Sequence, residues 1–134
     1  MKNLFLHELT HVLVFNPELM KELGMTTTKI FDGSFVTFAN SPKILTVSHQ
    51  HFNCRTLNGI PLENQGTEGS AGSNWEARYI LGDYMISTDY IDNVINDITL
   101  ALFEDSGFIK SNIIVEAYLN LGKIWDVNFL IKNV

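Results

Sequence analysis

The stretch His7-Glu8-Leu9-Thr10-His11 constrains the fold of this chain more than any other part of the sequence. In an α-helix, residues four positions apart lie one above the other on the same face, so His7 and His11 can reach one metal ion. Glu8 lies beside this pair and can approach a water molecule bound to that ion. This pattern is typical of a zinc site with two imidazole ligands and a general base. It therefore predicts a helix here and a third ligand elsewhere in the chain.

A chance match on an apolar helix is the alternative interpretation of this pattern. Leucine, valine and phenylalanine make the predicted helix Asn3–Phe15 apolar on most of its sides. A carboxylate such as Glu8 on so apolar a helix costs free energy unless it has a partner or a role. Glu8 therefore favours the zinc interpretation.

Composition limits the class of protein. The chain has 134 residues, of which 46% are hydrophobic and 18% are charged, which predicts one globular domain with a real core. Its net charge of -6 and its scattered lysines and arginines argue against a nucleic-acid partner. No apolar run approaches the ~20 residues that a membrane-spanning helix needs. His7 and Glu8 interrupt the short apolar start, so we expect no secretory signal there.

Turn and capping signals divide the first part of the chain. Asn16-Pro17 ends the first predicted helix, because the residue before a proline is pushed out of the α region. Asn16 can then cap a second short helix that ends at Gly24. A hairpin is predicted over Thr26–Asn40, with its turn at Asp32-Gly33.

The later elements are less regular. Hydrophobic spacing and turn residues predict a helix over Ser41–Phe52, a strand over Leu57–Glu63, a glycine-rich loop over Gln65–Ser73, a short helical turn over Asn74–Ile80, a tight connection over Gly82–Thr88, and a helix over Tyr90–Leu102 that is followed by Gly107. A further helical turn or two is predicted over Glu116–Leu121. The alternation of helices with a hairpin is consistent with an α+β fold.

Several of these segments carry a family resemblance. They are Gln50–Cys54, Pro61–Gly66, Gly69–Glu76, Met85 and Ile98–Phe108. Together with the histidine motif they resemble the leishmanolysin family of zinc metallopeptidases, peptidase family M8 of the metzincin group. The family has a third histidine in a setting that matches Gly72-Ser73-Asn74, and a Met-turn about eleven residues later, where Met85 stands.

The resemblance implies a single, partial leishmanolysin-like domain over residues 1–134, with the α+β fold of the C-terminal part of a metzincin catalytic domain. It implies one Zn²⁺ ion held by His7 and His11, with Asn74 at the third ligand position, Glu8 as the general base and Met85 beneath the metal. It also implies protein or peptide substrates, and an extracellular or membrane-associated location.

The sequence departs from the family pattern in ways that bear on activity. The third ligand position holds Asn74, whose neutral amide oxygen is a weak donor for zinc. The carboxylate of Glu76 could take the place of Asn74 as the third ligand, although the corresponding glutamate of relatives is not a zinc ligand. Val14 stands where the family has a glycine, and a β-branched residue does not readily adopt a positive φ. Val127 stands where relatives have a cysteine, which leaves Cys54 without its expected disulfide partner.

These departures leave three hypotheses open. The chain is an active zinc endopeptidase in which Asn74, Glu76 or a water fills the third ligand position, or a catalytically impaired pseudo-protease that keeps the fold and the peptide cleft, or a fragment that does not fold alone. His49 and His51 add no metal site, because residues two apart on a helix face different ways.

Overall fold

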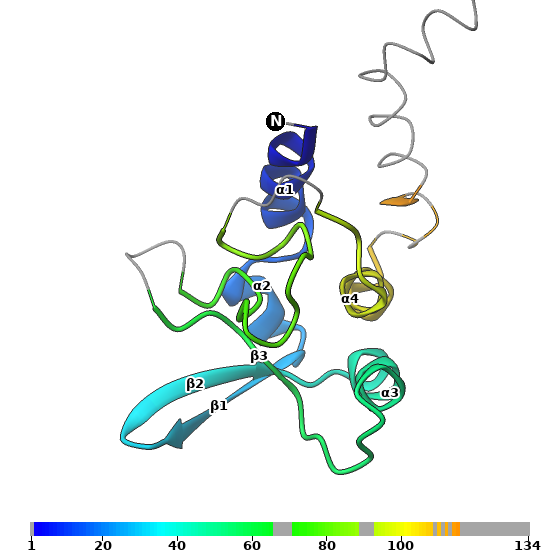
Figure 1. The fold of residues 1–134 in the computed structure, drawn as a ribbon. Helices are drawn as coiled ribbons and strands as arrows, with labels where there is room; N and C mark the ends of the chain where they lie inside the picture. Colours follow the sequence, from blue (N-terminus) through cyan, green and yellow to red (C-terminus); the bar gives the residue numbers. More distant parts are fainter. Residues whose placement is uncertain are drawn as a thin grey trace, which may run out of the picture.

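The computed structural model describes residues 2–65, 71–88 and 93–108, together with 110, 112, 114 and 115. The elements follow the order α1 (Lys2–Leu13), α2 (Pro17–Glu22), β1 (Thr26–Phe31), β2 (Ser34–Ala39), α3 (Pro42–His51), β3 (Ile60–Pro61) and α4 (Asp97–Ser106). Figure 1 shows the hairpin of β1 and β2 projecting away from the stacked helices α3 and α4. Helices and a small antiparallel sheet confirm the predicted α+β class.

The chain leaves α1 without a glycine. The N–H groups of Val14 and Phe15 both donate to the carbonyl oxygen of Thr10, across 2.9 and 2.8 Å, and this shared acceptor ends the helix. Val14 is buried, and it is not among the described residues with positive φ. Asn16 then caps α2, as predicted, by accepting from the N–H groups of Glu18 and Leu19. The chain thus passes from α1 to α2 with Val14 and Phe15 at the end of one helix and Asn16 at the cap of the next.

The hairpin forms as its turn residues predict. Asp32 and Gly33 both have positive φ, at 48° and 78°, which is the requirement of a two-residue turn that matches the twist of the strands. The sheet has the order β1-β2-β3. The predicted strand Leu57–Glu63 was too long, because only Ile60 and Pro61 form β3 and the chain then turns to pair Leu62 with Trp75.

The helix predicted from Tyr90 was wrong for residues 93–96, and residues 90–92 lie outside the described part of the chain. The helix α4 begins at Asp97, and Asn96 caps it by accepting from the N–H of Ile98. Val94 instead pairs with Asp83 in an isolated bridge. Val94, one of the apolar residues at helical spacing before Asp97, therefore forms a bridge and is not part of the helix. Gly107 ends α4 with a φ of 71°, as expected.

A carboxylate from α4 caps α3. The side chain of Ser41 makes no cap bond to its own helix. Instead Asp105 accepts from the N–H groups of Lys43 and Ile44 and from the hydroxyl of Ser41. These bonds satisfy N–H groups that have no partner within the helix, and they fix the two helices against each other.

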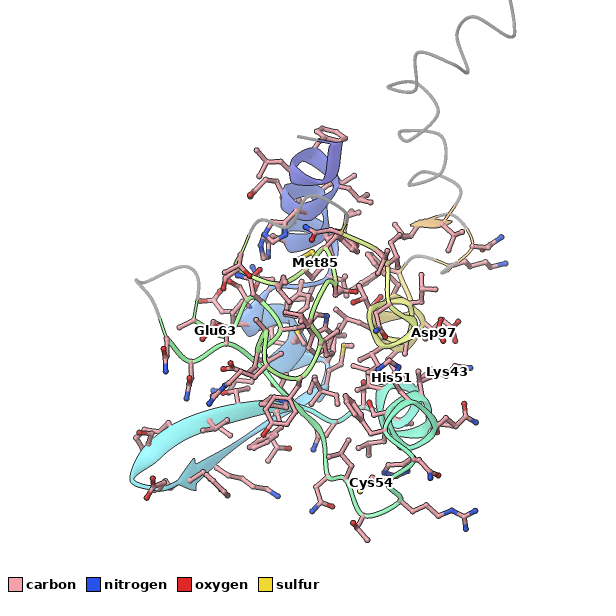
Figure 2. The ribbon with its side chains drawn as sticks, in the orientation of Figure 1. Lys43, His51, Cys54, Glu63, Met85 and Asp97 are labelled. Atoms are coloured by element: carbon pink, nitrogen blue, oxygen red, sulfur yellow. The ribbon has the colours of Figure 1, made fainter. Side chains whose placement is uncertain are left out.

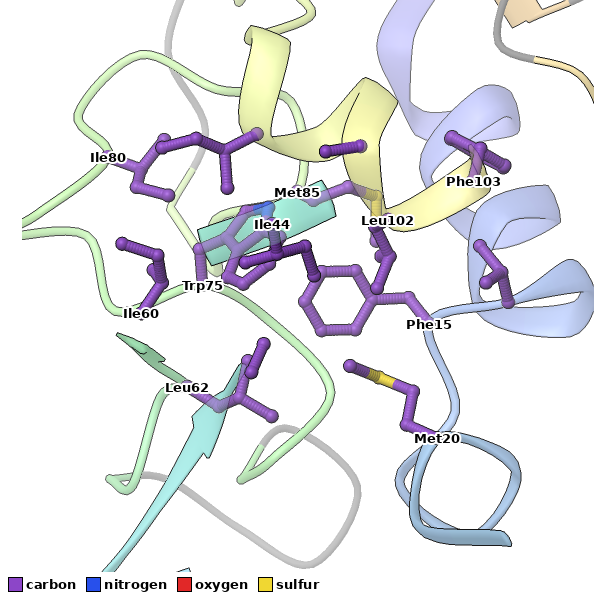
Figure 3. Packing of buried hydrophobic residues seen from close by; sticks show 14 of the residues in the cluster. Phe15, Met20, Ile44, Ile60, Leu62, Trp75, Ile80, Met85, Leu102 and Phe103 are labelled. Atoms are coloured by element: carbon purple, nitrogen blue, oxygen red, sulfur yellow. The ribbon is translucent and has the colours of Figure 1, made fainter. Parts of the chain in front are cut away.

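The core lies where α1, α3, α4 and the segment 60–86 meet (Figure 3). Its largest buried side chains include Leu6, Phe15, Met20, Ile44, Leu62, Trp75, Tyr84, Met85 and Phe103. The segment 74–80 forms a hydrogen-bonded turn, in which Tyr79 and Ile80 donate to the carbonyl oxygen of Glu76. The predicted turns over Glu116–Leu121 and the residue Val127 lie outside the described residues.

Candidate metal centre

The two histidines of the motif converge in the structure. Both lie on α1, and their Nε2 atoms are 2.9 Å apart. His7 donates from Nδ1 to the carbonyl oxygen of Tyr84 at 2.7 Å, and His11 donates from Nδ1 to the carbonyl oxygen of Phe15 at 3.1 Å. A carbonyl can only accept, so Nδ1 of each ring carries a proton, and Nε2 is the nitrogen left to bind a metal ion. The two Nε2 atoms lie within hydrogen-bond distance of each other, and the bonds from Nδ1 to backbone carbonyls are of the kind that orient zinc-bound histidines.

Tyr84 fixes the helix that carries this pair. Thr10 donates its hydroxyl proton to the carbonyl oxygen of Leu6, so the hydroxyl of Tyr84 is the donor in its 2.8 Å bond to Thr10. Tyr84 is buried, and burial raises the pKa of its phenol. One residue thus holds α1 through its side chain and holds His7 through its backbone.

Met85 lies on a tight turn next to Tyr84. Its side chain is fully buried, and Figure 2 places it among the turns between α1 and α4. Asp83 shapes this turn, because its carboxylate accepts from the N–H of Met85 at 2.7 Å and from the N–H of Asn96 at 2.8 Å. Burial raises the pKa of Asp83 to about 6, against the lowering effect of these hydrogen bonds. The turn that carries Met85 is therefore built around a buried carboxyl group.

Trp75 connects the turn to both helices. Its indole N–H donates to the hydroxyl of Thr99 on α4, and that hydroxyl donates to Asp83. Its ring packs edge-on against Phe15, with centroids 4.8 Å apart, and its backbone N–H donates to the carbonyl oxygen of Met85. The end of α1, the turn and α4 are thus held in one arrangement.

Asn74, which the family resemblance puts at the third ligand position, directly precedes Trp75. Asn74 is 4% exposed, and no group in the described part of the chain donates a hydrogen bond to its buried Oδ1 atom. A buried carbonyl oxygen without a donor is costly, and a cation would satisfy it. Within the described ranges, however, no group of three His, Cys, Asp or Glu side chains could hold a metal ion.

Glu76 does not complete the site. Its carboxylate accepts from the guanidinium of Arg78 at 2.9 Å, and this bond raises the pKa of Arg78. The described part of the chain contains no cluster of three metal-ligating side chains. Glu76 therefore does not form such a cluster with His7 and His11. The hypothesis of a carboxylate replacement is thus not supported.

The residues present fit zinc at two positions. Two nitrogens bound to one tetrahedral zinc ion lie roughly 3.3 Å apart, so a small separation of the Nε2 atoms of His7 and His11 from their 2.9 Å contact would admit the ion. Both rings also have the backbone acceptors that orient zinc-bound histidines. The third position offers only the neutral oxygen of Asn74. The site therefore matches zinc in its histidine pair and is weak in its third donor.

The other metal-ligating side chains lie apart from this centre. His49 donates from Nε2 to the carbonyl oxygen of Leu57, and His51 is exposed at the end of α3. Cys54 is a free thiol, and hydrogen bonding by Thr56 lowers its pKa.

An H-E-x-x-H motif on a helix, with the Nε2 atoms of its two histidines in contact and a buried methionine on a nearby turn, is typical of helix-based metallopeptidase sites. Comparison with known proteins agrees. The whole chain, residues 1–134, matches the profile of leishmanolysin, peptidase family M8, and the chain belongs to this family. Members of the family are zinc-dependent.

Individual relatives show the same family. A leishmanolysin-like peptidase of Drosophila melanogaster is 40% identical over 83 residues, which are 62% of this chain and 12% of the relative. A leishmanolysin-like peptidase of Caenorhabditis elegans is 36% identical over 93 residues, which are 69% of this chain and 14% of the relative. Leishmanolysin of Leishmania chagasi is 27% identical over 112 residues, which are 79% of this chain and 18% of the relative. The chain thus spans less than a fifth of each of these relatives.

Sequence reasoning did not identify the residues that support the histidines. Thr10, Asp83, Tyr84 and Thr99 do so; Thr10 fills a variable position of the H-E-x-x-H motif, and the other three lie far from it in the sequence. The one signal available was Asp83, a charged residue in a stretch of apolar neighbours, where a carboxylate needs donors.

Proposed function

We propose that this chain carries a zinc site for the hydrolysis of peptide bonds in proteins, with His7 and His11 as ligands and Glu8 as the general base. Asn74 occupies the third ligand position and weakens the binding of the metal. The observation that carries the proposal is the convergence of the two Nε2 atoms, each on a ring whose Nδ1 donates to a backbone carbonyl.

Each residue has a defined part in this chemistry. A bound zinc ion would lower the pKa of its water and stabilise the developing oxyanion. Glu8 is exposed beside the pair, so its carboxylate can take the proton of the attacking water and later deliver it to the leaving amine. Tyr84 and Phe15 hold the imidazole rings in orientation through their carbonyl oxygens.

The finer family features belong to the same proposal. The chain would correspond to the C-terminal part of a metzincin catalytic domain, and the turn at Met85 would be its Met-turn, a hydrophobic floor beneath the metal. The substrates would be proteins or peptides, and the location would be extracellular or membrane-associated. Within the described ranges no helix combines the length and the apolar character needed to cross a lipid bilayer.

A second candidate function is a catalytically impaired member that retains the fold and binds peptides. The neutral amide of Asn74 and the absence of a three-ligand cluster among the described residues favour it. Two histidines hold zinc much less firmly than three basic ligands. The two functions therefore differ in whether zinc is retained and water is activated.

The deciding experiment measures zinc content and cleavage of casein by the purified chain, with and without a chelator. Stoichiometric zinc and chelator-sensitive cleavage would support the peptidase. Glu8→Gln is the matched control, because it removes the base and leaves both histidines, so it should keep zinc and lose cleavage. Sub-stoichiometric zinc with no cleavage above the level of His11→Ala would support the impaired member and exclude the active enzyme.

A further inference from the structure

The strand β1 lies at one edge of the sheet. The strands of the sheet have the order β1-β2-β3, and every residue of β1 from Thr27 to Phe31 is exposed. The hairpin projects from the body of the molecule (Figure 1). An exposed edge strand presents a row of backbone N–H and C=O groups that can pair with another strand.

The register determines which backbone groups face outward. Leu62 donates its N–H to the carbonyl oxygen of Thr37, so Thr37 faces β3, and its neighbours Val36 and Phe38 face β1. In an antiparallel pair the residues opposite them exchange both hydrogen bonds. These are Lys29 and Thr27. The N–H and C=O groups of Thr26, Thr28 and Ile30 are therefore directed away from β2.

The same three residues share one face of the hairpin. Side chains alternate between the faces of a strand, so Ile30 lies on the face of Thr26 and Thr28, next to its cross-strand partner Phe35. Ile30 and Phe35 are 69% and 73% exposed. A cleft of about 510 Å³ opens on this face, lined by Thr26, Thr28, Phe35 and Thr37 of the hairpin and by Pro17 and Lys21 of α2.

We propose that the occupant of this edge is a second copy of the chain, paired antiparallel through β1 about a two-fold axis at Thr28. The outward residues are symmetric about Thr28, so an identical edge supplies one donor for each acceptor. Thr28 pairs with its own copy, and Thr26 pairs with Ile30. The two hairpins then form one continuous antiparallel sheet.

Side chains complement each other in this register. Paired residues of an antiparallel sheet lie on the same face, with Cβ atoms about 5 Å apart. Ile30 of the second copy therefore lies beside Thr26, on the face where the cleft opens. By symmetry each copy supplies an exposed isoleucine to the cleft of the other. Lys29 lies opposite Thr27, so the register brings no like charges together.

The first test measures the mass of the purified chain by sedimentation over a hundredfold concentration range that reaches about 1 mM. The wild-type chain should shift from monomer to dimer. Thr28→Pro removes an outward N–H and should weaken dimerisation at least about tenfold. Thr28→Val is the matched control: like the proline variant it loses the hydroxyl contact with Thr37, but it keeps the N–H, and it should dimerise as the wild type does.

A wild-type chain that stays monomeric over this range would overturn the proposal and leave the edge to a strand of another protein. A folded Thr28→Pro variant that dimerises as tightly as the wild type would do the same. The second test needs no variant. Amide hydrogen exchange of the wild type should show Thr27 and Lys29 protected at every concentration, and Thr28 and Ile30 protected only at high concentration. Equal exchange of Thr28 and Ile30 at both ends of the range contradicts the proposal.

Discussion

His7 donates a hydrogen bond from Nδ1 to the backbone carbonyl oxygen of Tyr84 across 2.7 Å. This bond joins a candidate zinc ligand on α1 to the turn that carries Met85, although the two residues are 77 positions apart in the sequence. The side chain of Tyr84 returns to the same helix through Thr10. The direction of the His7 ring is thus set by the turn as well as by the helix, so changes in the turn should reach the candidate metal centre.

Replacing Tyr84 by phenylalanine tests the side-chain half of this link. Tyr84→Phe removes the hydroxyl that donates to Thr10 and keeps the aromatic ring and the backbone carbonyl. A buried hydrogen bond of this kind contributes about 0.5–1.5 kcal/mol, so the free energy of unfolding should fall by about 1 kcal/mol. Denaturant unfolding followed by circular dichroism measures this change. Tyr79→Phe, at a half-exposed tyrosine, should leave stability unchanged; equal effects of the two variants would contradict the prediction.

The buried carboxyl of Asp83 predicts a pH dependence of stability. Its pKa is raised from 3.8 to about 6 in the folded chain, mainly by burial. The folded chain therefore binds this proton more tightly than the unfolded chain. The resulting stabilisation is fully present below pH 4 and is lost as pH rises through 6, up to roughly 3 kcal/mol at about 1.4 kcal/mol per pKa unit.

Asp83→Asn isolates this effect, because asparagine has a similar volume and does not titrate. The wild-type chain should be most stable relative to the variant near pH 4, and its advantage should shrink toward pH 7. Unfolding curves of both proteins at several pH values give the difference. An advantage that stays constant or grows between pH 4 and 7 would show that the carboxyl is not protonated in the fold.

The cap that Asp105 provides to α3 predicts a stability loss away from the metal centre. Asp105→Ala removes the acceptor of the N–H groups of Lys43 and Ile44 and of the hydroxyl of Ser41. Loss of a helix N-cap costs about 0.5–2 kcal/mol, and the loss here should lie at the upper end. Thermal unfolding measures it. Glu104→Ala, which removes the surface ion pair with Lys43, should cost less than about 1 kcal/mol, and a larger loss there than at Asp105 would refute the cap.

Local chemistry explains which parts of the fold the sequence predicts well. The cap at Asn16, the turn at Asp32-Gly33 and the end of α4 at Gly107 each depend on a few neighbouring residues, and all three are as expected. The predicted start of α4 was wrong because Val94 stands at a position that suits the apolar face of a helix, while its backbone pairs with the segment around Asp83. That pairing is a tertiary contact, which periodicity does not contain.

In the candidate site, too, the sequence predicts the local features and not the contacts between distant segments. The motif placed His7 and His11 on one helix face, and the structure brings their Nε2 atoms together. The bonds from Tyr84 and the Asp83 network join segments more than 70 residues from α1 in sequence, and no spacing rule predicts them. The role of Asn74 as third ligand stays a prediction from the family resemblance.

Asn74→His tests that role directly. A neutral imidazole is a stronger zinc ligand than an amide oxygen, so a histidine at the third position should raise zinc affinity at least about tenfold, as measured by competition with a chromogenic chelator. Asn64→His is the matched control, because it adds a histidine at an exposed position and should leave affinity unchanged. If Asn74→His also creates casein cleavage that the natural chain lacks, the natural chain is an impaired member whose loss lies in one donor atom. If the affinity for zinc does not change, residue 74 is not the third ligand position, and the buried amide oxygen has another cause.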